Sequence, residues 1–159
     1  MARSSQTYEN VEIFGLLQLT SDAILRVRQS QLREVGISNI QSALLYMVKH
    51  LEPPVTPAEI SRRLFRKPHT VFALLKQMER QGLVRKIKDL ERKNMARVVL
   101  TEKGEEAYRR SMEKWEAIDE IMSCLTREEH AALRSFLRQL RGTSRAKLGV
   151  HHRPVPRST

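Results

Sequence analysis

The chain has 159 residues, of which 40% are hydrophobic and 5% aromatic, and its formal net charge at pH 7 is +11. This length favours one domain with an oligomerisation extension, and the few aromatic side chains argue against large stacking platforms for single-stranded nucleic acid. The single cysteine excludes an intrachain disulfide, and no apolar run approaches the ~20 residues that a membrane span needs. The positive charge points to a polyanionic partner, and the lack of a signal-peptide pattern predicts a soluble, cytoplasmic protein.

The N-terminal part of the chain predicts one long helix. Residues 1–7 are expected to be disordered, whereas apolar side chains recur at helical spacing through residues 8–35. This segment carries more apolar side chains than one side of a small domain needs to bury, so we interpret it as a dimerisation helix. The alternative is a helix that packs only on the core of its own subunit.

A shorter helix follows. Gly36 suits the end of the first helix, and Ser38 and Gln41 have the spacing of a capping box that starts the next one. This second helix is expected to run to about residue 51. The pair Pro53-Pro54 then makes a stiff break before the next unit of the chain.

Two further helices are predicted after this break. Thr56, with Glu59 three residues later, is a helix start of the capping-box type. This helix must end near residues 65–67, because the residue before Pro68 is pushed out of helical geometry. The next helix is expected from Pro68 to Gly82, since glycine suits the left-handed position after a helix end.

The helix that begins at Pro68 has two different faces. Residues placed at 100° intervals bring apolar side chains together on one side and polar or basic side chains on the other. A helix that reads the major groove of DNA needs these two faces, although an ordinary amphipathic surface helix is the commoner alternative. The residues that we expect to face base edges are His69, Thr70, Ala73, Lys76 and Gln77.

The segment after this helix predicts a hairpin. Residues 83–88 and 97–100 are candidate strands separated by a polar turn, and Thr101 can cap a following helix. Two helices followed by a hairpin with a basic tip form a winged helix-turn-helix, whose wing reaches the DNA backbone or the minor groove. The residues expected to make such contacts are Arg66, Lys67, Arg92, Lys93 and Asn94.

Most of the net charge lies in this predicted unit. Between Arg62 and Arg97 there are twelve lysines and arginines and three acidic residues, which is a net charge of +9 out of the +11 of the whole chain. A positive field concentrated on one unit favours contact with the phosphates of nucleic acid.

The C-terminal part of the chain predicts two more helices and a tail. One helix is expected from residue 105 to about residue 125, and Thr126 with Glu129 forms a capping box for the last helix. We interpret residues 105–141 as dimerisation helices, because their apolar stripes and that of the first helix cannot all be buried on so small a domain. Residues 142–159 are expected to form a basic, flexible tail.

No motif for catalysis or nucleotide binding is present. The sequence lacks glycine-rich phosphate loops, the zinc-protease helix motif, the nucleophile elbow and paired cysteines. Cys124 lies on an apolar stripe and is expected to be buried and inert, with a redox sensor as the alternative. His151 and His152, in the expected tail, would bind only a stray metal. We therefore predict no enzyme activity, no cofactor and no metal site.

Several segments resemble those of a known family. The run Gly82-Leu83-Val84 before a basic strand, the turn Asp89-x-x-Arg92-Lys93 and the exit Val98-x-Leu100-Thr101-Glu102-Lys103-Gly104 are similar to the multiple-antibiotic-resistance regulator (MarR) family. The resemblance extends upstream to residues 36–41 and covers roughly residues 21–140. It implies a homodimeric, ligand-responsive transcription factor.

The chain departs from the family pattern at two places. Family members usually carry an Asp-Arg-Arg-like cluster at the wing tip, and the matching residues here are Arg92, Lys93 and Asn94. Short polar residues early in the family's reading helix are replaced by Phe72 and Ala73. Both departures affect expected DNA contacts, so the family's DNA sequence preference is not carried over to this chain.

The resemblance also implies an effector pocket between the dimerisation helices and the winged unit, for a small aromatic or lipophilic ligand. Possible lining residues are Tyr46, Phe14, Trp115 and Met112, although packing in the core explains each of them equally well.

Together these patterns predict a mainly α (α+β) fold. Residues 36–104 form a winged helix-turn-helix with a two-stranded wing, flanked by N- and C-terminal dimerisation helices. The predicted function is a homodimeric, sequence-specific DNA-binding transcriptional repressor that a small-molecule ligand releases from a pseudo-palindromic operator in double-stranded DNA. The alternative is an architectural, nucleoid-type protein that coats nucleic acid without an operator or an effector.

Overall fold

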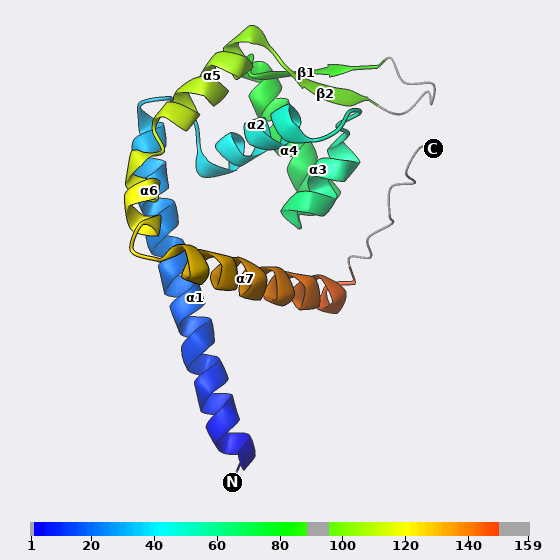
Figure 1. The fold of residues 1–159 in the computed structure, drawn as a ribbon. Helices are drawn as coiled ribbons and strands as arrows, with labels where there is room; N and C mark the ends of the chain where they lie inside the picture. Colours follow the sequence, from blue (N-terminus) through cyan, green and yellow to red (C-terminus); the bar gives the residue numbers. More distant parts are fainter. Residues whose placement is uncertain (1, 89–95, 150–159) are drawn as a thin grey trace.

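The computed structural model describes residues 2–88 and 96–149, which form seven helices and two strands (Figure 1). In chain order these are α1 (Ala2–Arg33), α2 (Asn39–His50), α3 (Pro57–Leu64), α4 (Pro68–Arg80), β1 (Val84–Ile87), β2 (Arg97–Leu100), α5 (Glu102–Glu113), α6 (Glu116–Met122) and α7 (Arg127–Lys147). The predicted mainly α fold with a two-stranded wing is therefore confirmed. In Figure 1, α2, α3, α4 and the strands gather at one end of the molecule, and α1 extends away from them.

The core of the winged unit lies between α2, α3, α4 and the two strands. Leu44 and Leu45 of α2, Ile60 of α3, and Leu75 and Met78 of α4 are completely buried. These residues come from the apolar faces that the helical spacing predicts, so burial of apolar surface explains why three short helices pack together.

The wing is an antiparallel pair of strands. Val84 of β1 lies opposite Leu100 of β2, and both strands lie inside the segments predicted for them. The N–H of Val98 donates a hydrogen bond to the carbonyl of Val55 at 2.7 Å, so β2 is also tied to the chain just before α3. The strand β2 is thus hydrogen-bonded both to β1 and to the segment before α3.

Two predicted capping boxes start α2 and α7. The hydroxyl of Ser38 accepts from the N–H of Gln41, whose side chain accepts in turn from the N–H of Ser38. Thr126 and Glu129 make the same reciprocal pair at the start of α7. Each pair satisfies two backbone donors that the helix itself leaves free, which fixes where the helix begins.

The helix predicted after Gly104 is broken into α5 and α6. Arg28 of α1 is 6% exposed, and its guanidinium donates to the carbonyl of Ser111 at 2.7 Å and to that of Lys114. The same guanidinium lies over the ring of Trp115. Because Arg28 takes the carbonyls at the end of α5, the helix ends there and a new one begins after Trp115.

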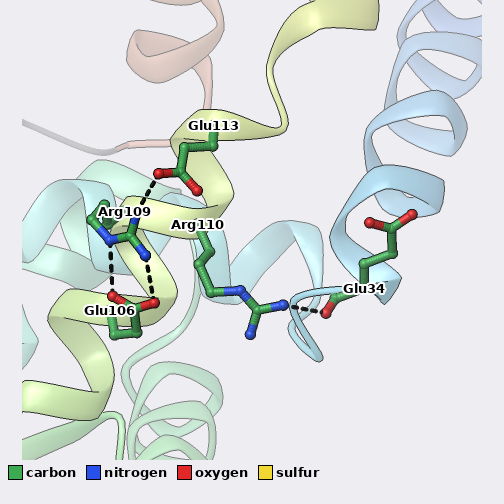
Figure 2. A network of polar contacts seen from close by, with 5 residues as sticks. All are labelled: Glu34, Glu106, Arg109, Arg110 and Glu113. Atoms are coloured by element: carbon green, nitrogen blue, oxygen red, sulfur yellow. Dashed lines mark hydrogen bonds and ion pairs between the residues drawn. The ribbon is translucent and has the colours of Figure 1, made fainter.

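A polar network on α5 adds a further contact between α1 and α5 (Figure 2). Arg110 donates through Nη2 to the backbone carbonyl of Glu34, at 2.8 Å, just beyond the end of α1. Beside it, Arg109 bridges Glu106 and Glu113 on the exposed surface of α5. The bond to Glu34 connects two helices, whereas the Arg109 pairs lie within one helix and contribute little to stability.

Gly104 allows the start of α5 to approach the turn that follows α4. A Cβ atom at this position would lie 1.9 Å from the carbonyl oxygen of Leu83. The side chain of Thr101 donates to the carbonyl of Gly82, and Lys103 Nζ donates to the carbonyl of Gln81 at 2.7 Å. The first turn of α5 is therefore in direct contact with the turn that follows α4.

The ends of the chain differ from the prediction. Residues 2–7 were expected to be disordered but belong to α1, since no glycine or proline precedes Gly15 to interrupt the helix. Residues 142–147, assigned to a flexible tail, continue α7, which ends near Gly149, a residue with φ of 66°. Gly142 lowers the stability of the helix only slightly, so α7 continues through this position. The left-handed conformation of Gly149 is the one that ends α7. Residues 150–159 of the expected tail lie outside the described residues.

The outer surfaces of α1 and α7 carry many large apolar side chains. On α1 the exposed ones are Tyr8, Val11, Ile13, Phe14, Leu16, Leu17, Leu19, Leu25 and Val27. On α7 they are Leu133, Phe136, Leu137 and Leu140. Apolar surface of this extent marks an interaction site in a soluble chain. Among the described helices, none combines the length and apolarity of a bilayer-spanning helix.

Candidate nucleic-acid interface

The turn between α3 and α4 is fixed by a buried serine. Phe65 adopts the left-handed conformation with φ of 53° and ends α3 within the predicted range. Ser61 Oγ donates to the carbonyl of Arg66 at 2.6 Å, and the N–H of Arg66 donates to the carbonyl of Ser61 at 3.2 Å. Pro68 then occupies the first turn of α4, where its missing N–H costs nothing. The direction of α4 relative to α3 is therefore well defined.

The helix α4, called the reading helix from here on, has the two faces that its sequence predicts. Val71, Leu75 and Met78 are buried against the core. The residues predicted to face base edges are all exposed, and they are His69, Thr70, Ala73, Lys76 and Gln77. Arg66 and Lys67 are exposed in the turn before them. The structure thus brings seven of the predicted site residues onto one surface, while Arg92, Lys93 and Asn94 lie outside the described residues.

Part of the positive charge on this unit is paired with acidic side chains. Glu59 binds Arg62 at 2.5 Å and Arg63 at 2.7 Å. The prediction of a capping box at Thr56 is therefore only half right, because Thr56 accepts from the N–H of Glu59 but the Glu59 carboxylate is bound to the two arginines. These pairs lower the net charge that α3 adds to the surface.

An apolar side chain lies within this basic surface. Phe72 of the reading helix is 55% exposed, and Lys86 Nζ of β1 lies 4.6 Å from the centroid of its ring. From the sequence, Phe72 is only a departure from the family pattern. Its contact with Lys86 joins the reading helix to the wing, and no local sequence pattern indicates it.

A cavity of about 570 Å³ lies where α1, α2 and α5 meet. Three of the possible pocket residues, Tyr46, Met112 and Trp115, line it, whereas Phe14 lies farther out on α1 and does not. Arg28 also lines the cavity, and burial lowers the pKa of its guanidinium from the usual value. The volume lies within the range of small-molecule sites, and the lining combines aromatic rings with one cationic group.

Another polar side chain in the cavity wall, that of Asn39, is only partly hydrogen-bonded within the described part of the chain. Asn39 donates through its amide to the carbonyl of Leu25 at 2.8 Å, but its buried Oδ1 accepts no hydrogen bond among the described residues. Sequence reasoning missed both Asn39 and Arg28, because they come from different helices and meet only in the folded chain.

The environment of Cys124 contradicts the prediction that it is buried. Cys124 is exposed, because it lies in the turn between α6 and α7 rather than on the apolar side of a continuous helix. Within residues 2–88 and 96–149, no group of three or more His, Cys, Asp or Glu side chains could hold a metal ion. His151 and His152 lie outside this part of the chain.

The fold and this surface define a winged helix-turn-helix protein, in which an exposed basic helix and a hairpin share one side of a small domain. Residues 35–96 match the model of the MarR family. This match lies within the winged unit and agrees with the resemblance to this family that the sequence shows.

Several solved structures have this fold. The organohalide-sensing RdhR-CbdbA1625 transcriptional regulator, in its 2,4-dichlorophenol-bound form, is 28% identical, with a TM-score of 0.75 over 96% of this chain and 90% of that chain. MepR from S. aureus, in complex with DNA, is 22% identical, with a TM-score of 0.72 over 80% and 94% of the two chains. A MarR mutant from E. coli, complexed with operator DNA, is 19% identical, with a TM-score of 0.75 over 83% and 95%. No curated protein sequence matches the chain.

Proposed function

We propose that this regulator is a homodimeric repressor that binds a pseudo-palindromic operator and leaves it when a small aromatic or lipophilic ligand binds. The exposed polar and basic surface of the reading helix is the observation that carries the proposal. In this proposal His69, Thr70, Ala73, Lys76 and Gln77 face base edges. Arg66, Lys67, Arg92, Lys93 and Asn94 hold phosphates or enter the minor groove.

The exposed apolar surfaces of α1 and α7 support binding as a dimer. The apolar surfaces of α1 and α7 have no cover within the described part of the subunit, and pairing with a second copy would bury them. A two-fold axis between the copies would place two reading helices ~34 Å apart, one helical turn of DNA. The DNA complexes of MepR and of the MarR mutant support the choice of double-stranded DNA as the partner.

The test of this function is the selection of genomic fragments by the purified full-length protein at near-physiological salt. We expect one or a few intergenic sites to be enriched, each with a two-fold repeat whose centres lie about one helical turn apart. A specific regulator should prefer its site to bulk DNA by roughly 10³-fold or more. Even retention of fragments across the genome would contradict the proposal and favour the architectural alternative, which the charge of +11 also permits.

The cavity between α1, α2 and α5 is the proposed effector site. Its aromatic lining suits an aromatic ring, and Arg28 supplies positive charge for a phenolate or a carboxylate. The 2,4-dichlorophenol complex of the RdhR-CbdbA1625 regulator supports a ligand of this chemical class.

The effector site can be tested through Trp115, because it is the only tryptophan in the chain and lies in the cavity wall. We expect 2,4-dichlorophenol to change the fluorescence of Trp115 with saturation and to weaken operator binding over the same concentration range. Replacing Ala43, another lining residue, by Phe should fill the cavity and abolish both effects. The Ser42→Ala variant, at a neighbouring lining position, should retain both. A fluorescence change that persists in Ala43→Phe would exclude this cavity as the binding site.

A further inference from the structure

Phe72 is the exposed large apolar side chain of the reading helix. The other bulky apolar residues of α4 are buried or half-buried, and Phe72 alone among them is exposed by more than half of its surface. Because Phe72 and Lys76 are four positions apart, their side chains are neighbours on one side of the helix. Phe72 therefore lies beside a residue that is proposed to contact bases.

The ring of Phe72 is held in place from the wing side. Lys86 Nζ lies 4.6 Å from the ring centroid and 3.4 Å from Glu79 Oε2, and the N–H of Lys86 donates to Glu79 Oε1 at 3.2 Å. Glu79 belongs to the same helix as Phe72, so Lys86 is anchored to the reading helix while its cation contacts the ring. This contact restricts the position of the ring, while Phe72 remains 55% exposed.

The ring of Phe72 also borders a hollow whose wall contains lysine and arginine side chains. Phe72 lines a cavity of about 640 Å³ together with the first turn of α3 and with Arg62, Lys86 and Lys88. Two of these three cations are paired, Arg62 with Glu59 and Lys86 with Glu79, and all three remain in the wall of the hollow. A hollow with such a lining can take the phosphate backbone that separates the major groove from the adjacent minor groove. With the backbone there, the ring of Phe72 lies at the edge of the major groove.

The apolar group that B-DNA presents in the major groove is the C5 methyl group of thymine. We propose that Phe72 reads a thymine methyl group in each half of the operator, and so determines part of the DNA sequence preference. This inference rests on the proposed operator binding by the reading helix. Since Phe72 and Lys76 are one helical turn apart, the thymine lies within about two base pairs of the pair contacted by Lys76.

The test removes the methyl group from DNA rather than the side chain from the protein. Each thymine of the selected operator is replaced in turn by deoxyuridine, which lacks only the C5 methyl group and keeps the same hydrogen bonds. We expect one thymine position per half-site at which this replacement weakens binding of the unmodified protein by roughly fourfold, the equivalent of one buried methyl group. At this position the replacement should not affect binding of Phe72→Ala.

The matched control is Phe72→Leu, which retains an apolar side chain and should retain most of the sensitivity to the methyl group. Because Phe72 is exposed, both variants should fold, and equal thermal unfolding midpoints check this. If the unmodified protein prefers its operator but no deoxyuridine replacement weakens it, the inference about Phe72 is wrong and the proposed function stands. The inference is also wrong if Phe72→Ala shows the same sensitivity. If the unmodified protein prefers no site over bulk DNA, the proposed function itself fails and the role of Phe72 falls with it.

Discussion

The guanidinium carbon of Arg28 lies 4.3 Å from the centre of the Trp115 ring, and the same group binds the carbonyls at the end of α5. Arg28 of α1 thus binds the end of α5 and covers Trp115, the residue just before α6. It also lies in the wall of the proposed effector cavity. Arg28 therefore joins the long N-terminal helix to the helix that leaves the winged unit.

Replacing Arg28 by Ala should lower the free energy of unfolding by about 2–3 kcal/mol, because buried carbonyls lose a charged donor and Trp115 loses its cover. The measurement is urea unfolding at a fixed protein concentration. Replacing Arg109 by Ala is the control, since its ion pairs with Glu106 and Glu113 are exposed and should contribute at most about 0.5 kcal/mol. Equal effects of the two substitutions would contradict this assignment.

Replacing Gly104 by Ala should destabilise the chain by about 1–3 kcal/mol, because the added Cβ atom would overlap the carbonyl oxygen of Leu83. Gly142 provides a matched control within α7, where an added Cβ atom meets nothing within 4 Å. Gly142→Ala should stabilise the helix by about 0.5–1 kcal/mol. Thermal unfolding of both variants checks the opposite signs, and a stabilised Gly104→Ala would show that α5 does not approach Leu83 this closely.

Replacing Lys76 by Ala should weaken operator binding by roughly 1–3 kcal/mol if Lys76 bonds a guanine, and should relax the preference at one base pair. Replacing Arg92 by Ala should instead weaken binding to all sequences alike and lower the salt slope by about one unit. Binding isotherms at several salt concentrations separate the two effects. If Lys76→Ala changed neither affinity nor preference, the assignment of the reading helix would be wrong.

Replacing Phe136 by Glu should convert the proposed dimer to monomers at micromolar concentration, because this side chain is 59% exposed on the apolar surface of α7. Ser135→Glu introduces the same charge at the adjacent position, which helical spacing places away from that surface, and should remain dimeric. Sedimentation velocity distinguishes the two. A dimeric Phe136→Glu variant would place the subunit contact elsewhere.

Glu129 should titrate below the usual pKa of a glutamate. The N–H of Thr126 donates to its carboxylate and, with a smaller contribution from the Thr126 side chain, lowers its pKa. A lowered pKa means that the capping box stabilises α7 above the pKa of the unfolded chain and that this contribution is lost as the pH falls through the pKa of the folded chain. An NMR titration of the Glu129 carboxylate measures the shift, and Glu129→Gln should lack the corresponding pH dependence of stability. A Glu129 pKa at the ordinary value would show that the capping box is not formed in solution.

The parts of the fold that sequence predicts well are those set by neighbouring residues. Capping boxes at Ser38 and Thr126, the helix end near Phe65 and the strand at residues 97–100 depend on contacts within a few positions, and each occurs as predicted. The positions of the exposed reading-helix residues follow from helical spacing alone.

The parts that sequence does not predict depend on contacts between distant segments. Arg28 is 83 residues before Ser111, so no periodicity in residues 105–125 reveals that the helix is broken there. The exposure of Cys124 follows from the resulting turn between α6 and α7. The contact between Phe72 and Lys86 likewise requires the hairpin to fold back on the reading helix.

The close approach of α5 to the turn after the reading helix has a mechanical consequence. Thr101, Lys103 and Gly104 connect α5 directly to residues 81–83, so a rotation of α5 should displace the turn that follows the reading helix. Tyr108 and Met112, farther along α5, line the cavity that includes Arg28. A ligand that tilts α5 at that end should therefore also shift the turn at residues 81–83, at the other end of the same helix. In the proposed dimer, the distance between the two reading helices would then depend on the tilt of α5 at the cavity. The fit of the two helices to one turn of DNA would depend on the same tilt, although the cavity lies away from the DNA.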